Sequence, residues 1–169
     1  MSKSTLPVWD EPEFRYAEFR ADGDAMTGVV VRYGDEANLG EFREQFAPGS
    51  LRWDDVIVNL MHRRDNPVAR TGAGLTLTET GGALEARVEP PESEYGKLAL
   101  DLVRGRLLRG FSMEFRAVKE DWRGDLRVIR EARLLGIGIV DRPAYSESEI
   151  AVRAAVNRPQ PKPRRRRAL

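Results

Sequence analysis

The sequence of 169 residues contains no cysteine and a single histidine, His62, and these two scarcities exclude several classes of protein. Without cysteine there is no disulfide framework, no thiolate zinc site and no cysteine nucleophile. One histidine cannot build a multi-histidine metal site, which leaves only carboxylate-bound Mg²⁺ or Ca²⁺ as an open metal chemistry. We expect neither a cofactor nor a bound metal.

Long apolar runs are also missing. No stretch approaches the roughly 20 residues that a helix needs to cross a bilayer. The first residues, Met1-Ser-Lys-Ser-Thr5, lead into charged sequence without the apolar core of a signal peptide. These observations predict a soluble, intracellular protein that makes no contact with a membrane.

The charge of the chain is unevenly distributed. Lys and Arg total 28 against 27 Asp and Glu, but six basic residues and no acidic one lie in residues 157–169. The remaining residues, 1–156, therefore hold 22 basic and 27 acidic side chains. The sequence predicts an acidic body followed by a basic, low-complexity Pro/Arg tail that is disordered.

Strand-like sequence dominates the body. Residues 1–12 read as an extended arm, and residues 13–33 contain two β-branched and aromatic segments separated by a turn at 21–24. The apolar run 56–61 fits a buried strand. Further along, the sequence predicts a hairpin over 75–89, a helix capped by Ser93 and ended by Gly105, a strand over 107–118, a turn over 121–125 and a strand over 126–140.

Many short strands and few helices favour an α+β domain over an alternating βαβ fold. We predict a mainly antiparallel, β-barrel-like domain with a few helices. The expected organisation is an arm over residues 1–12, a single domain over 13–156 and a disordered tail over 157–169.

His62 is the one imidazole in the chain and follows the predicted buried strand. Alternation along that strand places it on the same face as Val58 and Leu60, at the edge of an apolar surface. A rigid backbone and a partly dry environment suit a general base. The alternative interpretation is an ordinary half-exposed histidine at the end of a strand.

Ser112 lies in a segment, 110–115, whose alternation turns the apolar side chains inward and the serine to the opposite face. Gly110 would let a backbone or a substrate approach closely. A serine hydroxyl needs a neighbouring base to become a nucleophile, and His62 is the one imidazole available for that. The alternative is a solvent-facing serine without chemical function.

Four segments of the chain carry a resemblance to a known family. They are Phe46-Ala-Pro-Gly-Ser50, then Val58-Asn-Leu-Met-His62 with Pro67-Val-Ala-Arg70, then a helix over 98–105 with Leu107-Leu-Arg-Gly-Phe-Ser-Met-Glu-Phe115, and finally Leu135-Gly-Ile-Gly-Ile-Val-Asp-Arg-Pro-Ala-Tyr145. In this order they resemble the prohead maturation proteases of tailed bacteriophages, which are similar in fold to the herpesvirus assemblins. The resemblance covers residues 13–155.

The resemblance implies a serine endopeptidase with Ser112 as nucleophile and His62 as general base. It implies cleavage of the major capsid protein and of a scaffold segment, and of the protease itself, inside the assembling prohead in the cytoplasm of the bacterial host. It is also compatible with a homo-oligomer.

One position departs from the family. The family often has a carboxylate early in the closing strand, as a candidate third catalytic member, and Gly136 stands there in this chain. Glu131, Asp141 and Glu114 are possible substitutes. Glu114 shares a strand face with Ser112, but two residues along a strand span about 7 Å, which favours a role in shaping the substrate cleft.

Two other functions stay open at this point. Gly136 is compatible with a catalytically inactive scaffold or assembly module of the same fold. The arginines of residues 158–167 could bind nucleic acid or an acidic protein surface, or could serve only to keep the chain soluble.

Overall fold

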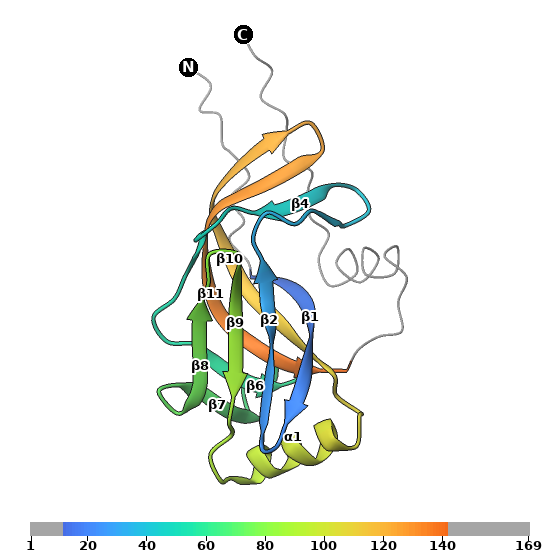
Figure 1. Ribbon diagram of the computed structural model, residues 1–169, viewed down its shortest axis with the longest axis vertical. Helices are drawn as coiled ribbons and strands as arrows, with labels where there is room; N and C mark the ends of the chain where they lie inside the picture. Colours follow the sequence, from blue (N-terminus) through green and yellow to red (C-terminus); the bar gives the residue numbers. More distant parts are fainter. Residues whose placement is uncertain (1–11, 142–169) are drawn as a thin grey trace.

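A closed barrel of eight β-strands forms the centre of the computed structural model, which describes residues 12–141 (Figure 1). Around the barrel the strand order is β10-β1-β2-β9-β8-β7-β6-β11, and β10 pairs with β11 to close it. The eight strands are β1 (Glu13–Asp22), β2 (Ala25–Arg32), β6 (Ile57–Leu60), β7 (Pro67–Thr71), β8 (Gly74–Glu79), β9 (Ala83–Val88), β10 (Gly110–Arg123) and β11 (Leu126–Val140).

Most neighbouring strands are antiparallel, but β11 also has parallel partners. It pairs in parallel with β6 and with two short strands outside the barrel, β4 (Arg43–Phe46) and β5 (Leu51–Arg52). The two-residue strand β3 (Ala37–Asn38) pairs with β4, and β7 runs parallel to β8. Strand β11 therefore connects the barrel to the short outer strands.

Alternating side chains divide β10 and β11 into an inner and an outer face. Phe111, Met113 and Phe115 of β10 and Ile137 and Ile139 of β11 are almost completely buried and belong to one apolar cluster. The residues between them face the outside of the barrel, because strand side chains alternate. The outer face of these two strands is where Ser112 lies.

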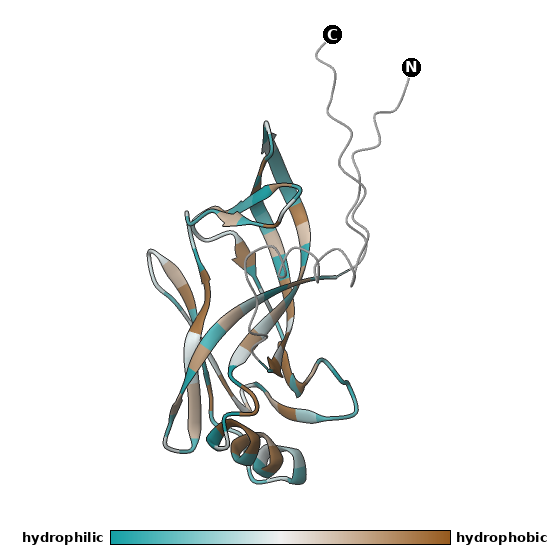
Figure 2. Cartoon of the chain, turned by 90° about the vertical axis from the view of Figure 1, so that its right-hand side faces the viewer, coloured by the Kyte–Doolittle hydropathy of each residue, from teal (hydrophilic) through white to brown (hydrophobic). Residues whose placement is uncertain are grey.

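A single helix within residues 12–141, α1 (Glu94–Arg104), lies across one end of the barrel (Figures 1 and 2). The hydroxyl of Ser93 accepts a hydrogen bond from the backbone N–H of Gly96 and caps its first turn. Gly105 caps its last turn, and Ala99 and Val103 face the apolar cluster. No helix among the described residues is long and apolar enough to span a bilayer.

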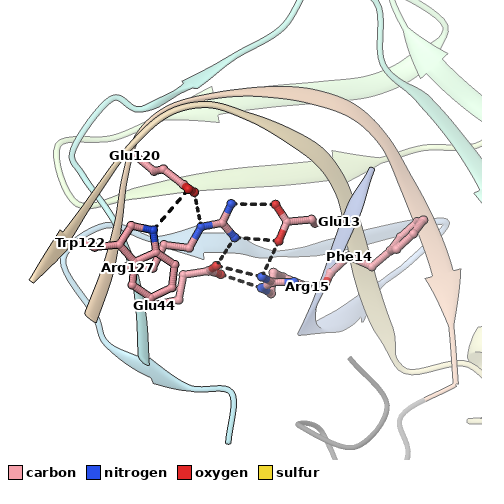
Figure 3. Close-up of polar contacts among 7 residues, drawn as sticks. All are labelled: Glu13, Phe14, Arg15, Glu44, Glu120, Trp122 and Arg127. Atoms are coloured by element: carbon pink, nitrogen blue, oxygen red, sulfur yellow. Dashed lines mark hydrogen bonds and ion pairs between the residues drawn. The ribbon is translucent and has the colours of Figure 1, made fainter. Parts of the chain in front are cut away.

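At the opposite end, the β10–β11 hairpin extends beyond the barrel beside β4 (Figure 1). Five charged side chains join this extension to the barrel in one buried cluster, which we call the ion cluster (Figure 3). Its members are Glu13, Arg15, Glu44, Glu120 and Arg127.

The guanidinium of Arg127 lies at the centre of the ion cluster and is completely buried. Its terminal nitrogens donate to both carboxylate oxygens of Glu13, at 2.7 and 2.9 Å, and to Glu44 at 3.0 Å. Arg15 donates to both oxygens of Glu44, at 2.6 and 2.8 Å. Burial alone would raise the pKa of Glu44, but the two arginines overcome it and lower the pKa below its ordinary value.

The predicted β-barrel is confirmed, as are the turn near 21–24, the strand at 56–61, the hairpin over 75–89 and the helix between Ser93 and Gly105. The expectation of a few helices is not met within residues 12–141, which hold one. The arm and the basic tail lie outside the described residues, Pro12 excepted.

Two element boundaries differ from the predictions. The strand expected from residue 107 begins at Gly110, because Leu107 and Leu108 donate their backbone N–H groups to the carbonyl of Leu102 and stay attached to the helix end. The turn expected over 121–125 is confined to Gly124 and Asp125, because the paired strands β10 and β11 continue to Arg123 and Leu126.

Candidate active site

His62 follows β6 in a tight turn that changes the direction of its side chain. Met61 and His62 both have a left-handed backbone, with φ of 52° and 58°. The N–H of Met61 donates to the carbonyl of Ile139, and that of Arg63 to the carbonyl of Leu60. Strand alternation therefore stops at Leu60 and does not determine where the imidazole points.

The imidazole of His62 lies on Gly138 of β11. A Cβ atom built on Gly138 would stand 2.8 Å from Cε1, 2.8 Å from Nε2 and 2.9 Å from Cδ2 of the ring. Three nearly equal distances mean that the face of the ring covers the glycine. The prediction that His62 shares the face of Val58 and Leu60 is thus wrong, since those two side chains belong to the interior cluster.

Ser112 lies directly beside this position. In the antiparallel pairing of β10 and β11 its partner is Gly138 itself. Opposite residues of an antiparallel pair point to the same face, with Cβ atoms about 4.5–5.5 Å apart. The imidazole therefore occupies the place of the side chain that would neighbour Ser112, and the structure brings together the two residues that the sequence singles out.

Both groups are shielded from solvent. Ser112 is 9% exposed, and the two ring nitrogens of His62 are buried without a hydrogen-bond partner among the described residues. Burial lowers the pKa of His62 from 6.5 to about 4. The ring is therefore neutral at neutral pH, which is the state that a general base requires.

This pKa leads to a testable pH dependence. Because the unfolded chain binds a proton at about 6.5 and the folded chain only at about 4, the free energy of unfolding should fall as the pH drops from 6.5 to 4. A proton NMR titration should show the single histidine titrating near pH 4. The substitution His62→Gln should remove the contribution of this histidine to that fall in the free energy of unfolding. A pKa at or above 6.5 would contradict the buried, unpaired ring.

Glu114 lies on the same outer face, one cross-strand pair away. Its partner is Gly136, and its Oε2 lies 3.2 Å from where a Cβ of Gly136 would be. Burial raises the pKa of Glu114, and the charges of Arg64 and Arg116 oppose this. The carboxylate therefore fills the space over Gly136, just as the imidazole fills the space over Gly138.

The other two carboxylates considered for a third catalytic member lie elsewhere. Glu131 pairs with Lys119 across the hairpin and forms an ion pair with it at 3.3 Å. Asp141 follows directly after the end of β11. Of the three acidic candidates, Glu114 is the one that lies next to Ser112 on the same face of β10.

Two aromatic residues of β1, Phe14 and Tyr16, pack over the outer face beside the site. Phe14 packs edge-on against His62, with ring centroids 4.6 Å apart, and its side chain is directed away from the ion cluster (Figure 3). The ring of Tyr16 lies over Gly110, where an added Cβ would come within 2.2 Å of it. The space over Gly110 that we expected to admit substrate is therefore filled by Tyr16.

The fold and the site define a β-barrel protein with a serine–histidine pair on the outer face of two adjacent strands. The sequence matches the model of the caudovirus prohead serine protease family over residues 12–161, and the chain belongs to that family. No curated protein sequence matches it.

A solved structure shares the fold. The capsid assembly protease gp21 of bacteriophage T4 is similar with a TM-score of 0.52 and 10% sequence identity, over 79% of this chain and 100% of that one. At this identity the likeness concerns the fold alone.

Proposed function

We propose that this chain is a serine endopeptidase that cleaves capsid and scaffold proteins, and itself, during maturation of a phage prohead. The observation that carries the proposal is the register of β10 and β11, which sets Ser112 opposite the glycine covered by the imidazole of His62. Membership of a prohead serine protease family supports the substrate class.

The chemistry assigned to the pair is acyl transfer. Ser112 Oγ attacks the carbonyl carbon of a peptide while His62 accepts the hydroxyl proton. The carbon–nitrogen bond then breaks, and His62 returns the proton to the leaving amine. Water attacks the resulting ester, again through His62, and releases the new carboxyl end and the free serine.

The hydrogen bond from Ser112 to His62 is not formed in this structure, since both ring nitrogens lack a partner within residues 12–141. Such bonds are often long in unliganded enzymes and shorten when substrate binds.

The surface beside the pair suits an extended peptide with an apolar side chain. Phe14, which packs on the imidazole, and Met61, which precedes His62 in the chain, are 37% and 49% exposed. Action on capsid and scaffold proteins would place the enzyme inside the assembling prohead, in the cytoplasm of the bacterial host. Association into a homo-oligomer and contact of residues 158–167 with nucleic acid remain separate predictions.

Co-expression with the matching capsid protein tests the proposal. The wild-type chain should shorten the capsid protein, and Ser112→Ala should leave it intact, because Ser112 is the serine paired with the glycine that the imidazole of His62 covers. Ser50→Ala is a matched control: Ser50 is also buried, its hydroxyl has no described partner, and its loss should not affect processing. Equal processing by wild type and Ser112→Ala would overturn the assignment of Ser112, and no processing by the wild type would favour the inactive assembly module.

A further inference from the structure

Three strands carry one row of outward-facing positions through the candidate site. Gly138 of β11 pairs with Ser112 on one side and, in the parallel pairing with β6, with Asn59 on the other. The side chain of Ile57, two residues before Asn59, lies on the outer face, because its Cγ2 is 3.7 Å from where a Cβ of Gly136 would be. By alternation the side chain of Asn59 emerges on this same face.

The imidazole of His62 therefore lies between Ser112 and Asn59. Its face rests on the central glycine of the row, as the near-equal distances to Cε1, Nε2 and Cδ2 show. Nδ1 and Nε2 stand on different edges of an imidazole ring. A ring lying flat over Gly138 can thus direct one nitrogen toward β10 and the other toward β6.

Asn59 is a buried polar residue without a described use. It is 4% exposed, and its Oδ1 has no hydrogen-bond partner within residues 12–141. Nδ1 and Nε2 of the neighbouring imidazole likewise have no hydrogen-bond partner within residues 12–141. Buried polar atoms in folded proteins are almost always paired, so unpaired ones gathered around one glycine indicate a functional arrangement.

We infer that Asn59 is the positioning residue of His62: its Oδ1 and the ring Nδ1–H, both unpaired in this structure, form a hydrogen bond in the working enzyme, with Nδ1–H as the donor, and this leaves Nε2 free to take the proton of Ser112. The inference rests on the proposed function. A serine, a histidine and a neutral amide would then act in line across β10, β11 and β6. Proteases that orient their histidine through an asparagine use the same chemistry on another fold.

The geometry favours Asn59 over Glu114 for this role. The carboxylate of Glu114 lies over Gly136, whereas Asn59 is paired with Gly138, the glycine under the imidazole. The pKa of His62 is lowered by burial, with no carboxylate among the described residues offsetting it. A neutral partner is consistent with a ring that stays unprotonated.

The test uses nitrogen-15 NMR on the full chain, where a single histidine makes every imidazole signal unambiguous. In the wild type at neutral pH, Nδ1 should carry the proton. In Asn59→Leu, which is similar in size but cannot accept a hydrogen bond, the proton should move toward Nε2. Acylation of Ser112 by a fluorophosphonate should slow about tenfold, the effect of losing one hydrogen bond. Asn59→Ala serves if Asn59→Leu does not fold.

Asn59→Asp provides the rescue. Its carboxylate should restore the proton on Nδ1, raise the pKa of His62 above the wild-type value and recover most of the acylation rate. Asn38→Leu is the control, since Asn38 is exposed, lies on β3 and uses its side-chain Oδ1 to accept a hydrogen bond from the N–H of Gly40.

Unchanged proton occupancy and pKa in Asn59→Leu would overturn the inference, even if the variant were less stable. The proposed function fails separately, if the wild-type chain shows no acylation at Ser112. The NMR readout does not depend on proteolysis, so the two failures can be told apart.

Discussion

Replacing Gly138→Ala is expected to lower the rate of acylation of Ser112 by at least about 100-fold, the size of effect that a lost general base produces. The new methyl group would stand 2.8 Å from the imidazole of His62, closer than real Cβ contacts allow. The ring must leave its place beside Ser112. Residue 138 supplies no reacting atom itself. A lower acylation rate in Gly138→Ala would therefore show that the reaction depends on the position of the imidazole.

Two other glycine substitutions separate this explanation from general damage. Gly82→Ala should leave the rate unchanged, since nothing lies within 4 Å of its added Cβ. Gly136→Ala presses on the carboxylate of Glu114 at 3.2 Å and not on His62. A larger loss in Gly136→Ala than in Gly138→Ala would assign the central role to Glu114. A normal thermal unfolding midpoint in each variant would confirm that the barrel is intact.

Replacing Arg127→Met is expected to lower the free energy of unfolding by about 3–5 kcal/mol, because it leaves buried Glu13 without its main counter-charge and buried Glu44 with only one of its two arginines. Glu13 and Glu44 are at most 2% exposed, and both accept hydrogen bonds from this guanidinium. A domain is stable by only about 5–15 kcal/mol, so the loss would approach the whole margin. Urea denaturation of the purified chain measures it.

Arg43→Met is the matched control. Arg43 forms two ion pairs, with Glu36 and Asp125, but its side chain is 41% exposed. Exposed pairs contribute about 0–1 kcal/mol, so the same substitution should have a small effect there. Equal destabilisation by the two variants would contradict the assignment of the ion cluster as a buried anchor. Adding Glu13→Gln to Arg127→Met should recover part of the loss by removing one stranded charge.

The ion cluster also concerns the candidate site. Glu13 and Arg15 are inward neighbours of Phe14, whose ring packs on His62. Glu13 is bonded to Arg127 and Arg15 to Glu44, which fixes the start of β1 (Figure 3). The position of the Phe14 ring beside the site is fixed with it. Arg127→Met should therefore reduce activity in the folded fraction as well as stability.

Local features of the fold could be predicted from the sequence. The hairpin over 75–89 follows from alternation around a glycine-rich turn, and the helix from its Ser93 cap, apolar spacing and Gly105. The outward position of Ser112 follows from the apolar side chains on either side of it. Each of these signals lies within a few residues of the element that it determines.

The relation between the two site residues depends on long-range geometry. His62 reaches the outer face because it and Met61 adopt a left-handed backbone, which is uncommon for residues other than glycine and leaves no pattern in the sequence. The pairing of Ser112 with Gly138 depends on register, and an irregularity between Glu114 and Phe115 shifts that register nearby. Strand alternation alone would have turned the imidazole into the barrel.

The same limit applies to the other residues that sequence reasoning missed. Asn59 gains its meaning only from the parallel pairing of β6 with β11. Glu13 and Arg127 are 114 positions apart and meet because the barrel closes. One feature of the sequence does point to the site: Gly136 and Gly138 interrupt an otherwise apolar strand, and glycines within a strand often mark a place where other groups approach closely.

The most direct measurement of the central claim is labelling of the purified chain with a fluorophosphonate, followed by peptide mass spectrometry to locate the modified residue. With an intact serine–histidine pair, the label should be found on Ser112 at neutral pH. Labelling should be lost in His62→Ala, because the chain has no second imidazole. Labelling of Ser112 at the same rate with and without His62, or labelling of a different serine, would contradict the assignment.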